Sequence, residues 1–144
     1  FGGTKCGGVF GEAVVFARPE LAERSKYIRK QTTQLHSKMR FISAQYEALL
    51  QDDLFIDLGR RANAAAHSLF LGLSEMSSLE LNVRPAVNSL FPRLRDPAKS
   101  TLQEWSFFWD WDVAASQVRW MTAWDTSPTD IERFVAGVRQ VIAN

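Results

Sequence analysis

A lysine surrounded by small residues is the first group in this sequence that could do chemistry. Lys5 lies in the segment Gly2-Gly-Thr-Lys-Cys-Gly-Gly8, whose small side chains leave its amine open to a bulky flat partner. Lysines that form Schiff bases become nucleophilic when desolvation or nearby cations lower the pKa of the amine. The order of the glycines and the lysine differs from that of a Walker phosphate loop. The segment predicts either an attachment point for such a partner or a solvated lysine in a flexible N-terminus.

An arginine within an apolar segment is the second such group. Arg119 lies in Val118-Arg-Trp-Met121. A buried guanidinium needs an anionic partner, and its planar fork of donors suits a carboxylate held by two parallel hydrogen bonds. The alternation of a strand also allows Arg119 to lie on the wet face of an edge strand. Both interpretations of Arg119 stay open from the residues alone.

The remaining polar candidates are weaker. The segment 24–40 is rich in cations, including Lys30 and Arg40, which would suit a phosphate or would form an ordinary solvated helix face. The single cysteine, Cys6, excludes an internal disulfide and a multi-cysteine metal site, and we expect it to be a quiet small side chain. His36 and His67 have no metal-ligand spacing, so we expect both to be structural and predict no metal site.

The elements that must position these residues follow from apolar spacing and turn signals. The run 13–17 predicts a buried strand, and the glycines of 1–11 predict close approach of the backbone to a ligand or to another segment. We expect a long helix over 19–52, a break at Asp52-Asp53 and a second long helix over 54–76.

The second half of the chain changes to a mixed pattern. We expect strands over 79–83, 87–94, 106–111 and 117–122, a short helix over 96–104, and a last helix that opens at Ser127. Pro92 indicates an edge or a bulge. The five tryptophans of 105–124 predict core and subunit-interface packing. The sum is an α+β fold, with two long helices followed by a small, mainly antiparallel sheet with helices on one side.

Composition excludes several classes of protein. The chain has 144 residues, 46% hydrophobic and 23% charged, which is enough for one domain with its own core. A net charge of +1 without a basic block argues against nucleic acid as the main partner. No apolar run approaches the length that spans a membrane, so we expect no membrane partner and a cytoplasmic location.

The lysine segment resembles a known family. Phe1-Gly-Gly-Thr-Lys5, followed by the segment 7–16, is similar to the cofactor-lysine segment of low-specificity threonine aldolases. These enzymes have the aspartate-aminotransferase-like fold (fold type I) and use pyridoxal 5′-phosphate. Further similar stretches are 29–31, 35–45, 107–111 and 118–126. The resemblance covers essentially the whole chain, but only the C-terminal part of a family member of usual size.

The resemblance implies roles for individual residues. Lys5 would form the internal aldimine with pyridoxal 5′-phosphate, and Arg119 would hold the α-carboxylate of a β-hydroxy-α-amino acid. Lys30 matches a second active-site lysine near the cofactor. Arg40 would reach the cofactor phosphate from the neighbouring subunit of a dimer or tetramer, with Lys38 as the alternative.

The implied reaction is retro-aldol cleavage of L-threonine or L-allo-threonine to glycine and acetaldehyde. In the family, the group that stacks on the cofactor ring, the acid at its pyridine nitrogen and the phosphate turn come from an N-terminal large domain. The chain starts at Phe1 without Met, so we expect it to be the tail of a longer protein and to be inactive on its own. Its parts would be the lysine loop and strand of the large domain (1–18), a linking helix (19–52) and a small C-terminal domain (53–144).

Two alternatives come from other classes. The chain could be a stand-alone interaction module that self-associates through its helices and tryptophan cluster. It could also be part of another fold type I lyase or an aminotransferase, since Lys5 and Arg119 serve those chemistries equally.

Overall fold

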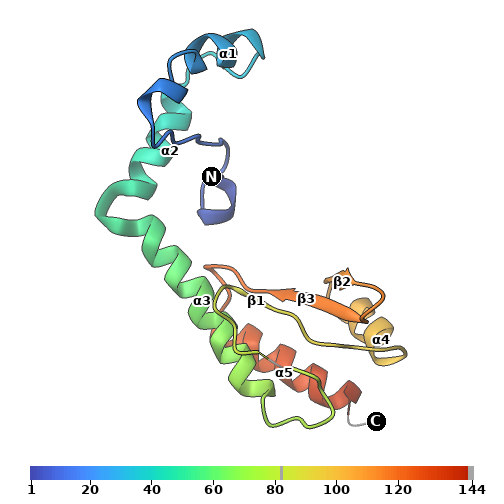
Figure 1. Ribbon diagram of the computed structural model, residues 1–144. Coiled ribbons are helices and arrows are strands. Elements are labelled where there is room, and N and C mark those ends of the chain that lie inside the picture. The colour runs from blue at the N-terminus through green and yellow to red at the C-terminus, as the bar shows by residue number, and fades with distance from the viewer. Residues whose placement is uncertain (82, 143–144) are drawn as a thin grey trace. The chain divides into compact units, whose positions relative to one another are not determined.

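The computed structural model describes residues 1–81 and 83–142. The chain divides into two compact units, Phe1–Ile56 and a second unit that starts at Asp57 (Figure 1).

The first unit consists of short helices and loops. In chain order its elements are the 3-10 turns η1 (Thr4–Cys6) and η2 (Pro19–Leu21), the helices α1 (Ser25–Gln31) and α2 (Arg40–Leu50), and the turn η3 (Gln51–Asp53). Gly3 and Leu49 are the buried residues among those described in this unit. It therefore holds together without an extensive apolar core.

The single helix expected over 19–52 is wrong, because the chain leaves the helical conformation after Gln31. The Thr32 hydroxyl donates to the carbonyl of Ile28 at 2.9 Å, a local bond that competes with continuation of a helix. Thr33 and Lys38 then take left-handed φ values of 61° and 62°, which no α-helix allows. Apolar spacing continued across this break and could not reveal it.

The buried strand expected over 13–17 is also wrong. Val14 and Val15 are 77% and 75% exposed. Within the described residues, the pairing nearest to this run is an isolated antiparallel bridge between Gly2 and Glu12. A strand needs a hydrogen-bonded neighbour, and an apolar run by itself does not supply one.

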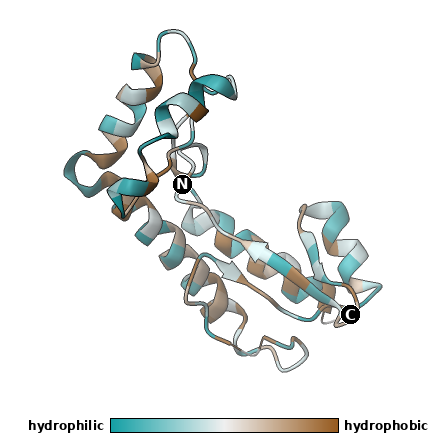
Figure 2. Ribbon diagram, turned by 45° about the horizontal axis from the view of Figure 1, so that its top comes forward, coloured by the Kyte–Doolittle hydropathy of each residue, from teal (hydrophilic) through white to brown (hydrophobic). Residues whose placement is uncertain are grey.

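The break and the helix that follows it are confirmed. Asp52 and Asp53 have positive φ values of 51° and 58°, and α3 then runs over Leu54–Leu73. Its buried residues recur at helical spacing, and they are Leu58, Ala62, Ala66, Leu69 and Leu73. In Figure 2, apolar and polar positions alternate around the helices, as this amphipathic pattern predicts.

The second unit adds a small sheet and two more helices. After α3 come β1 (Ser89–Leu90), α4 (Ala98–Trp105), β2 (Trp109–Asp112), β3 (Gln117–Met121) and α5 (Pro128–Ile142). The strands form an antiparallel sheet in the order β1-β3-β2, so β3 is its middle strand (Figure 1). The predicted α+β class, with a small antiparallel sheet, is confirmed.

The helices cover one face of this sheet. Val118 and Trp120 on β3 are buried in a core that includes residues of α3, α4 and α5. The Thr122 hydroxyl, just after β3, donates to the carbonyl of Ala62 on α3 at 2.8 Å. The alternation of a strand places Arg119 on the other face, which the helices leave uncovered.

The expected strands near residue 80 are shorter than predicted. Of the strand expected over 79–83, the described residues contribute an isolated bridge between Glu80 and Arg93, and Asn82 lies outside the described residues. Leu79 is buried as the alternation predicts, but Val83 on the same face is 76% exposed. The segment 87–94 contains the two-residue edge strand β1. Pro92 accepts a hydrogen bond from the amide of Val118 at 3.0 Å and donates none, which agrees with the edge position predicted for it.

The start of α5 confirms its predicted cap. The Asp130 carboxylate accepts from the Ser127 hydroxyl at 2.6 Å and from the Ser127 amide at 3.0 Å. The Asp130 amide donates back to the Ser127 hydroxyl at 3.2 Å. This reciprocal capping box satisfies donors that the first turn of a helix leaves free.

Candidate functional site

The loop that carries Lys5 is held against α2 by side chains. Lys5 lies in η1 and is exposed. The Gln45 side-chain oxygen accepts from the amides of Val9 at 2.7 Å and Phe10 at 3.2 Å. The Tyr46 hydroxyl accepts from the amide of Gly3 at 3.2 Å and donates to the carbonyl of Gly11 at 2.8 Å. The backbone on either side of Lys5 is therefore fixed, while its amine stays accessible.

Two glycines of this loop are required by close packing. Gly11 has a φ of 117°, and a Cβ there would lie 2.7 Å from the Cγ2 atom of Ile42 on α2. A Cβ on Gly8 would lie 2.9 Å from the carbonyl oxygen of Gly3. The predicted close approach of the glycine-rich backbone is thus explained by contacts with α2 and within the loop itself.

The other cations expected near a cofactor lie on two different helices of the first unit. Lys30 is in the last turn of α1, and Arg40 is the first residue of α2. Both are exposed, and the Arg40 guanidinium lies 4.7 Å from the ring centroid of Phe41. Lys38 precedes α2 in the left-handed conformation. None of the ion pairs formed by the described residues involves these cations, so they are available to an anion.

The edge-strand interpretation of Arg119 is wrong, and its interpretation as an anion-binding group stays a prediction. Arg119 lies on the middle strand, not on an edge strand, and it is half-buried. Its Nε donates to the hydroxyl oxygen of Ser89 at 3.3 Å, and its Nη2 donates to the sulfur of Met121 at 3.2 Å. Its Cζ lies 5.5 Å from the ring centroid of Trp111. Among the described residues no carboxylate pairs with Arg119, so its charge is free for an external anion.

The structure places Lys5 in the first unit and Arg119 in the second. Their joint action on one substrate therefore stays a prediction. Gln45 and Tyr46, which hold the lysine loop, and Ser89, which contacts Arg119, were not predicted from the sequence. A tyrosine within an apolar helical series was a usable signal, because a partly buried hydroxyl needs a hydrogen-bond partner. No local signal pointed to Ser89.

The tryptophan cluster is only partly a core. Trp120 is 3% exposed, but Trp109 and Trp111 are 69% and 57% exposed, and Trp105 is 51% exposed. The prediction of core packing is therefore wrong for these three residues. For Trp109 and Trp111 the reason is that β2 lies at the edge of the sheet with all four of its residues exposed, whereas Trp105 is the last residue of α4. Packing of the cluster at a subunit interface stays a prediction.

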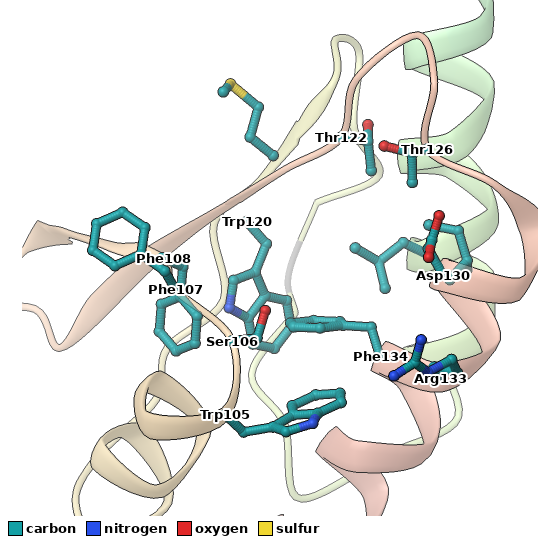
Figure 3. Close-up of a pocket in the computed structure, with 13 residues that line it drawn as sticks. Trp105, Ser106, Phe107, Phe108, Trp120, Thr122, Thr126, Asp130, Arg133 and Phe134 are labelled. Atoms are coloured by element: carbon teal, nitrogen blue, oxygen red, sulfur yellow. The ribbon is translucent and has the colours of Figure 1, made fainter.

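A pocket of about 330 Å³ lies beside the second half of β3 (Figure 3). Aromatic side chains from the end of α4, the connection to β2, and α5 form its walls, and they include Trp105, Phe107, Phe108 and Phe134. The indole nitrogen of Trp120 is buried without a hydrogen-bond partner, although it lies among these rings. Arg119 does not line this pocket, so the pocket is separate from the place where Arg119 is expected to bind a carboxylate.

The described residues contain neither a candidate metal site nor a helix that could span a membrane. No group of three or more histidine, cysteine, aspartate or glutamate side chains is arranged to hold a metal ion. None of the helices in that part of the chain has both the length and the hydropathy to cross a membrane.

Comparisons with known proteins give a consistent result over nearly the whole chain. No protein-family model matches it. It is 34% identical over 145 aligned residues to a low specificity L-threonine aldolase of Pseudomonas sp. (strain NCIMB 10558), covering 99% of this chain and 41% of the relative. It is 37% identical over 135 residues to the enzyme of the same name from Pseudomonas aeruginosa, covering 92% of this chain and 38% of the relative.

A solved structure supports the same relationship. The threonine aldolase of Leishmania major superposes with a TM-score of 0.84 at 30% identity, covering 98% of this chain and 42% of that structure. The chain thus spans about two fifths of the length of the relatives it matches. Sequence and fold together identify the chain as a relative of the low specificity L-threonine aldolases that corresponds to a part of their length.

Proposed function

We propose that this chain contributes the cofactor lysine and the substrate-carboxylate arginine of a pyridoxal 5′-phosphate-dependent threonine aldolase. The observation that carries the proposal is Lys5, an exposed amine on a backbone loop fixed by Gln45 and Tyr46. This arrangement occurs in a chain that is similar over 99% of its length to a low specificity L-threonine aldolase. The reaction would be cleavage of L-threonine or L-allo-threonine to glycine and acetaldehyde.

The residues present fit the cofactor. A covalently held group needs an accessible amine whose backbone does not move, and the lysine loop supports both properties of Lys5. Lys30 and Arg40 are exposed cations that form no ion pair with the described residues, so either can hold a phosphate. When bound, pyridoxal 5′-phosphate supplies an electron sink for the bond that breaks.

In this proposal, Arg119 binds the carboxylate of the substrate. A guanidinium binds a carboxylate through parallel hydrogen bonds and so fixes its orientation as well as its position. Fixing the carboxylate sets the direction of the substrate's Cα–Cβ bond, which is the bond that the reaction breaks. Arg119 is thus a positioning group for the substrate, and Lys5 is the group that holds the cofactor.

The proposal implies several partners. The chain requires the remaining three fifths of an aldolase, which would supply the cofactor-ring contacts and the acid-base groups. Its substrate is a small β-hydroxy-α-amino acid, and the assembly is a cytoplasmic homo-oligomer, a dimer or a tetramer. Arg40 acts across subunits in that assembly.

A chimera tests the proposed function directly. The segment of the Pseudomonas aeruginosa aldolase that matches this chain is replaced by residues 1–144. We expect the chimera to bind pyridoxal 5′-phosphate and to release acetaldehyde from L-threonine. Lys5→Ala should abolish both properties, whereas Lys26→Ala, at an exposed lysine of α1, should leave them unchanged. A folded chimera that neither binds the cofactor nor cleaves threonine would contradict the proposal.

The chain by itself gives a second test, of its dependence on the remaining part. After incubation with pyridoxal 5′-phosphate and reduction with borohydride, peptide mapping should show no preference for Lys5 over Lys26, Lys38 and Lys99. Threonine should not be cleaved. Selective labelling of Lys5 together with threonine cleavage would show that the 144 residues are sufficient.

A function without catalysis is favoured by one observation, the exposed aromatic residues. Phe107, Trp109 and Trp111 are each more than half exposed, and clustered exposed aromatic residues are typical of interaction surfaces. An interaction module would self-associate with increasing concentration in analytical ultracentrifugation and would bind no cofactor. The aldolase proposal instead requires cofactor absorbance in the chimera.

A further inference from the structure

The guanidinium of Arg119 is contacted from all three strands of the sheet. Ser89 on β1 accepts from Nε, and Met121, two residues further along β3, accepts from Nη2. Trp111 on β2 places its ring beneath the group, 5.5 Å from Cζ. A cation over a tryptophan face is attracted to it. These contacts give the side chain one preferred orientation on the uncovered face of the sheet.

The contact with Ser89 occupies one edge of the guanidinium. Nε and Nη2 share the side edge of the planar group, and a carboxylate can bind this edge or the end edge formed by Nη1 and Nη2. Nη1 has no hydrogen-bond partner among the described residues. Because the single N–H of Nε is used by Ser89, a carboxylate cannot take both donors of the side edge, whereas the Nη1 donors of the end edge remain free.

Ser89 is built into the sheet in a way that suits a fixed acceptor. It is 4% exposed, and β1 pairs it with Met121 and pairs Leu90 with Trp120. No other hydrogen bond of its hydroxyl is found among the described residues. Because a buried hydroxyl without a partner costs free energy, the bond to Arg119 satisfies Ser89 and restrains Nε at the same time.

We propose that Ser89 is a positioning residue, which orients Arg119 so that its Nη1–Nη2 edge receives a carboxylate end-on. The proposal rests on the proposed function for the identity of that carboxylate as the substrate's. The orientation itself follows from the contacts within the second unit. Ser89 touches neither substrate nor cofactor and acts through the guanidinium.

The test uses the 144-residue chain and NMR of the arginine Nε–H groups, with acetate as the carboxylate probe. In the wild-type chain, the Nε–H of Arg119 should exchange with water more slowly than that of Arg133, an exposed arginine whose side chain forms no hydrogen bond or ion pair with the described residues. Acetate should shift the guanidinium signals of Arg119 in a saturable manner.

Substitution of Ser89 should change both measurements. Ser89→Ala removes the acceptor, so the Nε–H exchange of Arg119 should accelerate about tenfold and the affinity for acetate should fall about three- to tenfold. Ser89→Thr keeps a hydroxyl on a residue that strands favour, and it should restore both values. Ser78→Ala, an exposed serine without a hydrogen bond among the described residues, is the matched control and should change neither.

Three results would overturn the proposal. They are an Arg119 Nε–H in the wild-type chain that exchanges as fast as that of Arg133, a wild-type Arg119 that does not respond to acetate, and a folded Ser89→Ala chain with wild-type exchange and affinity. The first result needs no variant and so does not depend on the stability of Ser89→Ala. Failure of the chimera to cleave threonine with these NMR results intact would instead contradict the proposed function alone.

Discussion

The two units of this chain are held together by different kinds of interaction. In the unit that carries Lys5, side chains of α2 bind the backbone of a glycine-rich loop, and few residues are buried. In the unit that carries Arg119, α3, α4 and α5 cover one face of a three-stranded sheet and form a continuous apolar core. Polar contacts fix one loop in the first unit, whereas burial fixes a whole layer in the second.

The two candidate groups, Lys5 and Arg119, are therefore held in place by different interactions. The Lys5 amine is exposed on a backbone that hydrogen bonds and close glycine packing hold in place. The Arg119 guanidinium is instead oriented by side chains that the sheet brings together from three strands. We therefore expect changes of buried volume to affect the second unit most and changes of backbone conformation to affect the first.

The largest effect should come from the core of the second unit. Leu73 on α3 is fully buried, so Leu73→Ala should lower the free energy of unfolding of this unit by about 3 kcal/mol through lost burial and a cavity. All five tryptophans lie in residues 105–124, so tryptophan fluorescence during urea unfolding reports on this unit. Leu71→Ala, at a 55% exposed position of the same helix, is the control and should cost much less. Equal losses of unfolding free energy in Leu73→Ala and Leu71→Ala would contradict the conclusion that burial stabilises the second unit.

A smaller effect should appear in the lysine loop after Gly11→Ala. The new Cβ would meet Ile42 at a φ of 117°, so we expect a local cost of about 2 kcal/mol. The amides of Val9 and Phe10 should lose protection from hydrogen exchange, while tryptophan fluorescence stays unchanged. Gly59 lies in α3, and a Cβ added there would have no neighbouring atom within 4 Å. Gly59→Ala should therefore stabilise α3 by about 0.5–1 kcal/mol. Unchanged protection in Gly11→Ala would show that the loop is not fixed by α2.

The smallest effect concerns pH and helix caps. Hydrogen bonds from the Ser127 side chain and amide lower the pKa of Asp130 below its usual value of 3.8. The carboxylate therefore stabilises α5 fully above that value, and its contribution is lost as the pH falls through the lower folded-state pKa. Helix α2 of the first unit has no side-chain cap.

The measurement for this prediction is the free energy of unfolding reported by tryptophan fluorescence between pH 5 and pH 2 (about the range in which aspartates titrate). Asp130→Asn should weaken the acid-dependent loss of tryptophan-reported stability in the second unit. If the loss is the same in the variant, the capping box does not contribute to the difference between the units.

The parts of the fold that the sequence predicted correctly depend on neighbouring residues. The helix that became α3, the break at Asp52-Asp53 and the cap of α5 each have their signal within a few positions of the element itself. The elements that were predicted wrongly depend on distant residues. The run 13–17 has the composition of a strand, but composition does not reveal whether a neighbouring strand exists to pair with it.

The residues with suitable chemistry could be recognised from the sequence alone. An accessible lysine among glycines and an arginine in an apolar strand have the chemical properties that a covalent cofactor and a carboxylate require, and these properties belong to the residue types. How Lys5 and Arg119 are held in place depends on the tertiary structure. Gln45 and Tyr46 reach the lysine loop from 35 or more residues away, and Ser89 reaches Arg119 across 30 residues. Such contacts arise because packing brings distant segments together, so a local pattern can signal that Tyr46 needs a partner but not which backbone group becomes that partner.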